Sequence, residues 1–166
     1  MCIRDRAIEE NDFFMFTNKE TDTLKKVTRL DLFEYPTVLK MEGFNVYGFI
    51  DSCSFDYKNI IDYKTGGIGK DEKYKDPDYT QLQIYALSLM QMHEVRVQNA
   101  WVEFITRDGN PFRGEALKVS PESIKKIEVD LSMKALDRVE LDLIKTAKEI
   151  ELFYQEYNES QEKLKL

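Results

Sequence analysis

Two apolar runs that each carry charged residues constrain the fold of this chain most. Gly48–Asp51 ends an alternating run with an acid, and Asn59–Gly66 places Asp62 and Lys64 directly after two isoleucines. A short apolar run of this kind is typical of a buried strand, where an unpaired charge is costly. Residues two apart project from the same face of a strand. The sequence therefore predicts a buried strand with an acid and a base on one face.

The Asp-x-Lys pattern alone does not indicate a site, because the chain contains it three times. The copies that begin at Asp56 and Asp71 lie in polar turns, whereas the copy at Asp62 follows an apolar pair. A structural ion pair between Asp62 and Lys64 explains the buried copy as well as a catalytic pair does. The strand pattern by itself leaves both interpretations open.

Asp51 favours the catalytic interpretation. A tight turn after its strand brings Asp51 beside Asp62, and two adjacent carboxylates repel each other unless a cation separates them. Carboxylate oxygens suit Mg²⁺ or Mn²⁺. Lys64 then lies at the edge of the coordination sphere, where it orients or deprotonates an attacking water and offsets charge on a phosphorane. The alternative for Asp51 is an acid that caps backbone amides near a turn.

A helix predicted over Tyr79–Met92 carries two further candidates, Gln81 and Tyr85. They are four residues apart and therefore face the same way. Each has a structural alternative, which is N-terminal capping together with Asp78 for Gln81 and core packing for Tyr85.

Residues 1–166 are expected to form one mixed α/β domain, with a catalytic core over about 32–119 and a helical region over about 120–160. Ser120 as N-cap and Pro121 at the first helical position predict the start of that last helix. Alternating and turn patterns predict the strands and hairpins, which are Phe33–Met41 paired with Phe44–Phe55, Ile60–Thr65, and Arg96–Thr106 followed by a hairpin that ends near Val119.

Composition limits the possible partners and location. The net charge of -7 and pI near 4.9 disfavour nonspecific coating of nucleic acid, so such a role needs a local basic patch or a bound metal. Two cysteines cannot build a disulfide framework or an iron–sulfur cluster, which indicates a reducing cytoplasm. No run approaches the roughly 18 apolar residues of a membrane span.

Three motifs together resemble the PD-(D/E)XK nuclease superfamily, in particular its RecB-like branch. They are Gly48-x-x-Asp51, Ile61-Asp62-Tyr63-Lys64-Thr65-Gly66 and Gln81-Leu82-x-x-Tyr85-Ala86, and the resemblance spans about residues 34–100. It implies a restriction-endonuclease-like core with a mixed central sheet flanked by helices. It also implies these roles: metal ligation by Asp51, Asp62 and the Tyr63 backbone carbonyl, catalysis by Lys64, and DNA contact or support of the site by Gln81 and Tyr85.

The function that this resemblance implies is Mg²⁺- or Mn²⁺-dependent hydrolysis of DNA, most simply by an exonuclease. Such proteins process DNA ends in recombination, repair or phage replication, in the cytoplasm of a bacterium or a phage-infected cell. DNA is the expected partner, with a helicase or a single-strand-binding or recombination protein as further candidates. The rival interpretations are a catalytically inactive module that binds DNA or a helicase, and a structural domain with a buried ion pair.

Members of the RecB-like branch usually carry a His or Glu on a helix ahead of the first strand. This chain offers Glu9, Glu10 and Glu20 in that region. The opening Met1–Arg6 resembles a translated sequencing adapter, so we expect the natural protein to extend further upstream. The upstream ligand would then lie outside this sequence.

Overall fold

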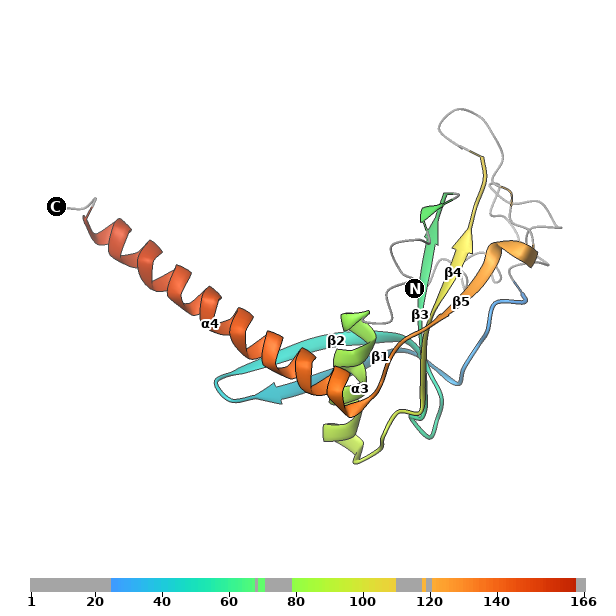
Figure 1. Ribbon diagram of the computed structural model, residues 1–166, viewed down its shortest axis with the longest axis horizontal. Coiled ribbons are helices and arrows are strands. Elements are labelled where there is room, and N and C mark those ends of the chain that lie inside the picture. Colours follow the sequence, from blue (N-terminus) through green and yellow to red (C-terminus); the bar gives the residue numbers. More distant parts are fainter. Residues whose placement is uncertain (1–24, 68, 71–78, 110–117, 119–120, 164–166) are drawn as a thin grey trace.

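The structure is a computed structural model, and it describes residues 25–67, 69–70, 79–109, 118 and 121–163 (Figure 1). Within these residues, five strands form one sheet in the order β1-β2-β3-β4-β5. Strands β3 and β4 are parallel and the other neighbours antiparallel, which confirms the predicted mixed α/β sheet. The elements are β1 (Leu32–Met41), β2 (Phe44–Cys53), β3 (Asn59–Gly66), α3 (Thr80–His93), β4 (Asn99–Thr106), η3 (Pro121–Ser123), β5 (Ile124–Glu128) and α4 (Met133–Lys163).

Strands β1 and β2 form the predicted hairpin. They pair along their length, from Leu32–Cys53 to Met41–Phe44. Gly43 in the connecting turn has a φ of 86°, a left-handed conformation that glycine adopts without strain. In Figure 1 the hairpin points to one side of the molecule, at a steep angle to β3, β4 and β5.

The alternation of side chains along β2 is interrupted at Asp51. Ile50 packs with α3 in the main core, whereas the hydroxyl of Ser52 accepts a bond from the segment before β1, on the opposite face of the sheet. Glu34, across the ladder in β1, has a left-handed φ of 47°. Strands β2 and β3 pair at Cys53–Ile60 and then at Ser52–Ile61, where the ladder between them ends. Asp51 is therefore the first β2 residue beyond that ladder.

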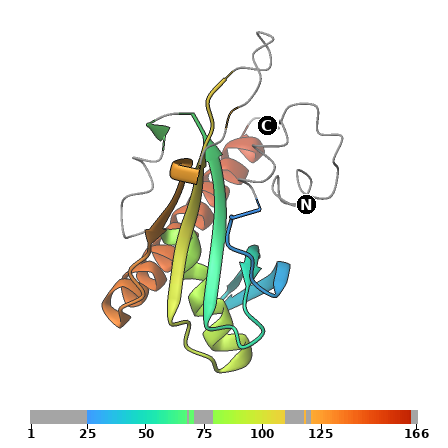
Figure 2. The ribbon, with the colours of Figure 1, turned by 90° about the vertical axis from the view of Figure 1, so that its right-hand side faces the viewer.

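Two core clusters cover the two faces of the sheet. Helix α3 supplies much of the first, and its buried residues include Leu82, Tyr85, Ala86 and Leu89, whose spacing places them on one side of the helix. Figure 2 shows β3 and β4 side by side, at the centre of the sheet. The smaller second cluster packs Val27 and Leu30 against the opposite face of β3. Strand β3 is thus buried on both faces, as its apolar run predicts.

The segment before β1 is fixed to the second face of the sheet through the backbone of Thr28. Its amide donates to the carboxylate of Glu103, at 2.8 Å, and its carbonyl accepts from the Tyr63 hydroxyl, at 2.6 Å. Glu103 has no exposed surface, and it also accepts a bond from Trp101 at 3.4 Å. These bonds attach the segment before β1 to β3 and β4, on the face of the sheet that carries Tyr63 and Glu103.

The predicted helix start at Ser120-Pro121 is wrong. Pro121 opens η3, a single 3₁₀ turn, and the next residues form β5 on the edge of β4. Helix α4 begins at Met133, where the Ser132 hydroxyl accepts a bond from the Ala135 amide at 3.3 Å. Backbone pairing with β4 outweighed the local capping pattern. Ser120 and Val119 lie outside the described residues, and the described part of the expected second hairpin is the bridge between Asp108 and Lys118.

Helix α4 confirms the predicted long helical C-terminal region, although it begins later than expected. None of the helices in the described part of the chain is long and apolar enough to span a membrane.

Candidate active site

Strand β3 brings Asp62 and Lys64 together, as the alternation of its side chains predicts. The Lys64 ammonium lies 2.8 Å from each carboxylate oxygen of Asp62. Asp62 is only 1% exposed, whereas the Lys64 side chain is 27% exposed. Ile61 and Tyr63 point to the opposite face, into the second core cluster. The pair therefore consists of a buried acid beside a base that reaches solvent.

Asp51 reaches this site from the end of β2. Its Oδ2 accepts a hydrogen bond from the backbone amide of Tyr63, at 2.8 Å. Because the β2–β3 ladder has already ended, the carboxylate supplies the acceptor that a neighbouring strand would otherwise provide. The bond agrees with the alternative expectation that Asp51 binds a backbone amide. It also places the Asp51 carboxylate against β3 at Tyr63, the residue between Asp62 and Lys64.

The electrostatics of the three groups are coupled. Burial raises the pKa of Asp62 to about 6, with the hydrogen bond from Lys64 opposing this and the charge of Asp51 adding to it. Burial also raises the pKa of Asp51, while the Tyr63 amide and the Lys64 charge act the other way. For Lys64, burial disfavours the ammonium, but the hydrogen bond and charge of Asp62 outweigh burial and raise its pKa. The site thus holds two acids that resist ionisation and one retained positive charge.

Helix α3 adds a chain of hydrogen bonds to the site. The Gln81 amide donates to the Tyr85 hydroxyl at 2.9 Å, which confirms that these residues face the same way. Gln81 Oε1 accepts from the Tyr79 hydroxyl at 2.8 Å. Tyr79 is the N-cap of α3 and makes no side-chain capping bond, and Asp78, the expected capping partner, lies outside the described residues. The side-chain amide of Gln81 therefore bonds to both Tyr79 and Tyr85.

Tyr85 is locked against the β1–β2 hairpin. It is 7% exposed, so it packs in the core as the structural alternative predicted, and its hydroxyl also joins the polar chain. A Cβ atom at Gly48 would lie 2.6 Å from the Tyr85 ring. Glycine at position 48 is therefore required for α3 to approach the strand that carries Asp51.

Comparison with known proteins identifies the family. The model described as the PD-(D/E)XK nuclease superfamily matches residues 6–162, nearly the whole chain. The chain belongs to this superfamily. No curated protein matches it. A crystal structure of a protein from Eubacterium rectale, named "Putative exonuclease", is similar with a TM-score of 0.47 and 15% identity, covering 75% of this chain and 46% of that one. The chain thus spans less than half the length of that protein.

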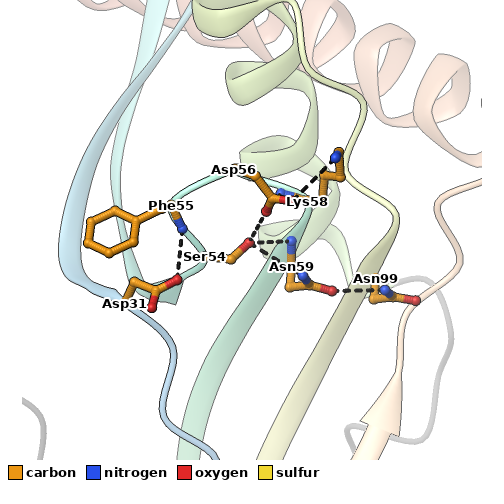
Figure 3. A network of polar contacts seen from close by, with 7 residues as sticks. All are labelled: Asp31, Ser54, Phe55, Asp56, Lys58, Asn59 and Asn99. Atoms are coloured by element: carbon orange, nitrogen blue, oxygen red, sulfur yellow. Dashed lines mark hydrogen bonds and ion pairs between the residues drawn. The ribbon is translucent and has the colours of Figure 1, made fainter.

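In this PD-(D/E)XK superfamily member, the exposed Asp-x-Lys copy has a different role. Asp56 and Lys58 form an ion pair at 3.3 Å with side chains 52% and 44% exposed, and the Ser54 hydroxyl donates to Asp56 at 2.6 Å. Figure 3 shows this network closing the turn between β2 and β3, with Asp31 bonded to the amide of Phe55. The copy at Asp71 lies outside the described residues.

Sequence reasoning missed the role of Tyr79 near the superfamily motifs. Tyr79 contacts both Gln81 and Asp62, with its hydroxyl 3.4 Å from Asp62 Oδ2, and its position two residues before Gln81 was the available signal. Glu34 matches a position that is commonly acidic in the RecB-like branch and was not assigned as a ligand; it lies within β1, and its charge contributes to raising the pKa of Asp51. The upstream candidates Glu9, Glu10 and Glu20 lie outside the described residues.

The donor chemistry of the site fits a hard divalent cation. Asp51 and Asp62 both offer carboxylate oxygens, the ligands that Mg²⁺ and Mn²⁺ prefer, and burial raises the pKa of each, so their ionised forms are short of compensating positive charge. Among the described residues, no group of three or more His, Cys, Asp or Glu side chains is close enough to hold a metal. A cation here would accordingly rely on two carboxylates completed by backbone oxygen and water.

Proposed function

We propose that this chain is a metal-dependent DNA nuclease of the RecB-like branch whose site is formed by Asp51, Asp62 and Lys64. The observation that carries the proposal is a buried Asp62 bonded to the Lys64 ammonium, with a second carboxylate, Asp51, bonded to the amide of the next residue, Tyr63. Superfamily membership indicates hydrolysis of phosphodiester bonds. An ion pair that served stability alone would need neither the adjacent acid nor an exposed side of Lys64.

Asp51, Asp62 and the Tyr63 carbonyl would hold Mg²⁺ or Mn²⁺. The cation would supply Lewis acidity and a water of lowered pKa. The Asp51 carboxylate accepts a hydrogen bond from the Tyr63 amide, and this bond would help to orient the Tyr63 carbonyl. The raised pKa of Lys64 keeps this side chain an ammonium, so its main role is to orient the attacking water and to offset negative charge on the phosphorane.

The proposed substrate is DNA, attacked at its ends, and the proposed processes are repair, recombination or phage replication. The acidic net charge of -7 supports action at a metal-centred site rather than along an extended basic surface. The cytoplasm is the proposed location, because the buried free thiol of Cys53 suits a reducing compartment. A helicase or a single-strand-binding protein is the proposed partner.

The test is digestion of labelled linear and closed circular DNA with Mg²⁺ or Mn²⁺. We expect the linear form to be shortened and the circular form to persist. Asp62→Asn and Lys64→Met should each lower the rate by at least about 10³-fold, because each removes a group that acts on the reacting phosphate.

Asp56→Asn is the matched control, since it alters an Asp-x-Lys copy that only closes a turn. It should leave the rate unchanged. Wild-type protein that binds DNA without cleaving either form would favour the inactive module. Equal activity of wild type and Asp62→Asn would contradict the assignment of the site.

A further inference from the structure

Tyr79 connects the helix motif to the buried acid. Its hydroxyl lies 2.8 Å from Gln81 Oε1 and 3.4 Å from Asp62 Oδ2, and the Lys64 ammonium lies 6.0 Å from its ring centroid. The side chains of Asp62, Tyr79, Gln81 and Tyr85 thus form one continuous polar chain from β3 to the first turns of α3. No role for Tyr79 follows from the superfamily motifs described above.

A count of protons shows why the direction of this chain matters. A tyrosine hydroxyl donates one hydrogen bond, so Tyr79 cannot donate to Gln81 and to Asp62 together. The shorter distance assigns the proton to Gln81, whose amide in turn donates to Tyr85. Asp62 is meanwhile bonded at both oxygens by Lys64. In this arrangement Lys64 is the closer donor to Asp62, and the Tyr79 hydroxyl stays 3.4 Å from Oδ2.

The same groups satisfy one another with all bonds reversed. If the Gln81 amide turns over, the Tyr85 hydroxyl donates to Gln81, Gln81 donates to the Tyr79 oxygen, and Tyr79 donates to Asp62. A side-chain amide offers both a donor and an acceptor, so Gln81 keeps a hydrogen bond to each of the two tyrosines in either direction. The reversed chain gives the carboxylate of Asp62 a fixed donor.

A divalent cation on Asp62 would favour that reversed arrangement. The cation and the Lys64 ammonium repel each other, so Lys64 must release at least one of the two oxygens that it now holds. The freed carboxylate then needs another donor to fix its orientation, and the Tyr79 hydroxyl is already beside Oδ2. Donors behind a ligating carboxylate commonly change metal affinity about 10–100-fold.

We propose that Tyr79 is a positioning residue that orients Asp62 toward a bound divalent cation, with Gln81 and Tyr85 setting the direction of its hydroxyl. The proposal rests on the proposed function, because it takes Asp62 to be a metal ligand. It assigns the helix motif a task inside the site.

The test is titration of the whole chain with Mn²⁺ alone, followed by the paramagnetic resonance signal of the free ion. Tyr79→Phe removes only the hydroxyl, and we expect it to weaken Mn²⁺ binding by about 10-fold. With DNA, kcat should fall while KM stays unchanged. The control is Tyr57→Phe, which removes a hydroxyl that accepts a bond from Tyr35 near His93, the last residue of α3. It should change neither the Mn²⁺ affinity nor kcat.

A double-mutant cycle with Gln81→Met adds a second measurement. If Gln81 acts through Tyr79, the double variant should lose no more Mn²⁺ affinity than Tyr79→Phe alone. Unchanged Mn²⁺ affinity in Tyr79→Phe, with a wild type that binds Mn²⁺ and cleaves DNA, would overturn the role of Tyr79 alone. A wild type that binds no Mn²⁺ would overturn the metal site, and the role of Tyr79 with it.

Discussion

At the scale of single residues, burial separates two identical tripeptide patterns. Asp62 is 1% exposed and its pKa is raised to about 6 by burial. The Asp56 side chain is 52% exposed and its pKa is lowered by the hydrogen bond from Ser54. The sequence allowed this distinction, because two isoleucines precede Asp62 while Asp56 lies among polar neighbours. The distances within the site depend on contacts between strands and were not predictable.

Asp62→Asn should stabilise the metal-free protein at neutral pH. Folding raises the pKa of Asp62 from 3.8 to about 6. The folded protein therefore holds this proton more tightly than the unfolded chain, and the stability that this contributes is complete below pH 4 and is lost as the pH rises from 4 to 6. The asparagine does not ionise and escapes this loss. Relative to wild type, the gain at pH 7.5 should be at most about 3 kcal/mol and should vanish near pH 4.

Urea unfolding with EDTA at both pH values measures this effect. Asp56→Asn is the control, and it should show no gain at pH 7.5 because the pKa of Asp56 is lowered. Addition of Mn²⁺ should stabilise wild type but not Asp62→Asn. If the difference in free energy of unfolding between Asp62→Asn and wild type were the same at pH 4 and at pH 7.5, the raised pKa of Asp62 would be refuted.

At the scale of elements, the site depends on where a strand leaves its neighbour. The patterns of alternation predicted the hairpin, β3 and α3 within one to two residues at most bounds. They did not predict the left-handed Glu34, or that the β2–β3 ladder ends before Asp51. Both features arise from pairing between distant segments. The hydrogen bond from the Tyr63 amide to Asp51 was foreseen only as a general alternative.

Strand β5 shows how local patterns mislead. Ile124 and Ile127 have a spacing that suits a helix, and Ser120-Pro121 is a favourable helix start. The structure places both isoleucines in β5, where they pair with Ile105 and Val102 of β4. The exposed edge of β4 offers backbone partners that no single-segment pattern contains.

Gly48→Ala should separate α3 from the hairpin. The added methyl would lie 2.6 Å from the Tyr85 ring, so either the ring or the strand must move. We expect a loss of about 1–3 kcal/mol in the free energy of unfolding. Cleavage should fall further than stability explains, because Tyr85 ends the polar chain to Asp62.

Gly67→Ala is the control for this change, since a Cβ there meets nothing within 4 Å. Chemical denaturation and initial cleavage rates of the two variants provide the comparison. Wild-type stability and activity in Gly48→Ala would show that the contact between Gly48 and Tyr85 does not constrain the site.

At the scale of the whole molecule, the compact sheet carries the site and α4 extends beyond it (Figure 1). Leu136 and Val139 near the start of α4 are buried. Farther along the helix, Ile150, Tyr154 and Tyr157 are 53%, 61% and 52% exposed. The apolar residues of α4 recur at helical spacing and so line one face of the helix. This spacing gives no information on what covers that face, because the cover depends on where the rest of the fold ends.

Across the molecule, the central claim of the proposed function is that Asp51 of β2 and Asp62 of β3 bind one divalent cation, with the polar chain of α3 beside Asp62. The most direct test of this claim is the anomalous scattering of Mn²⁺ in crystals of the whole chain. We expect a peak within about 2.0–2.3 Å of carboxylate oxygens of both Asp51 and Asp62, with the Tyr63 carbonyl as a third ligand. An ordered site without a peak there in saturating Mn²⁺, or a peak bound to only one of the two acids, would contradict it.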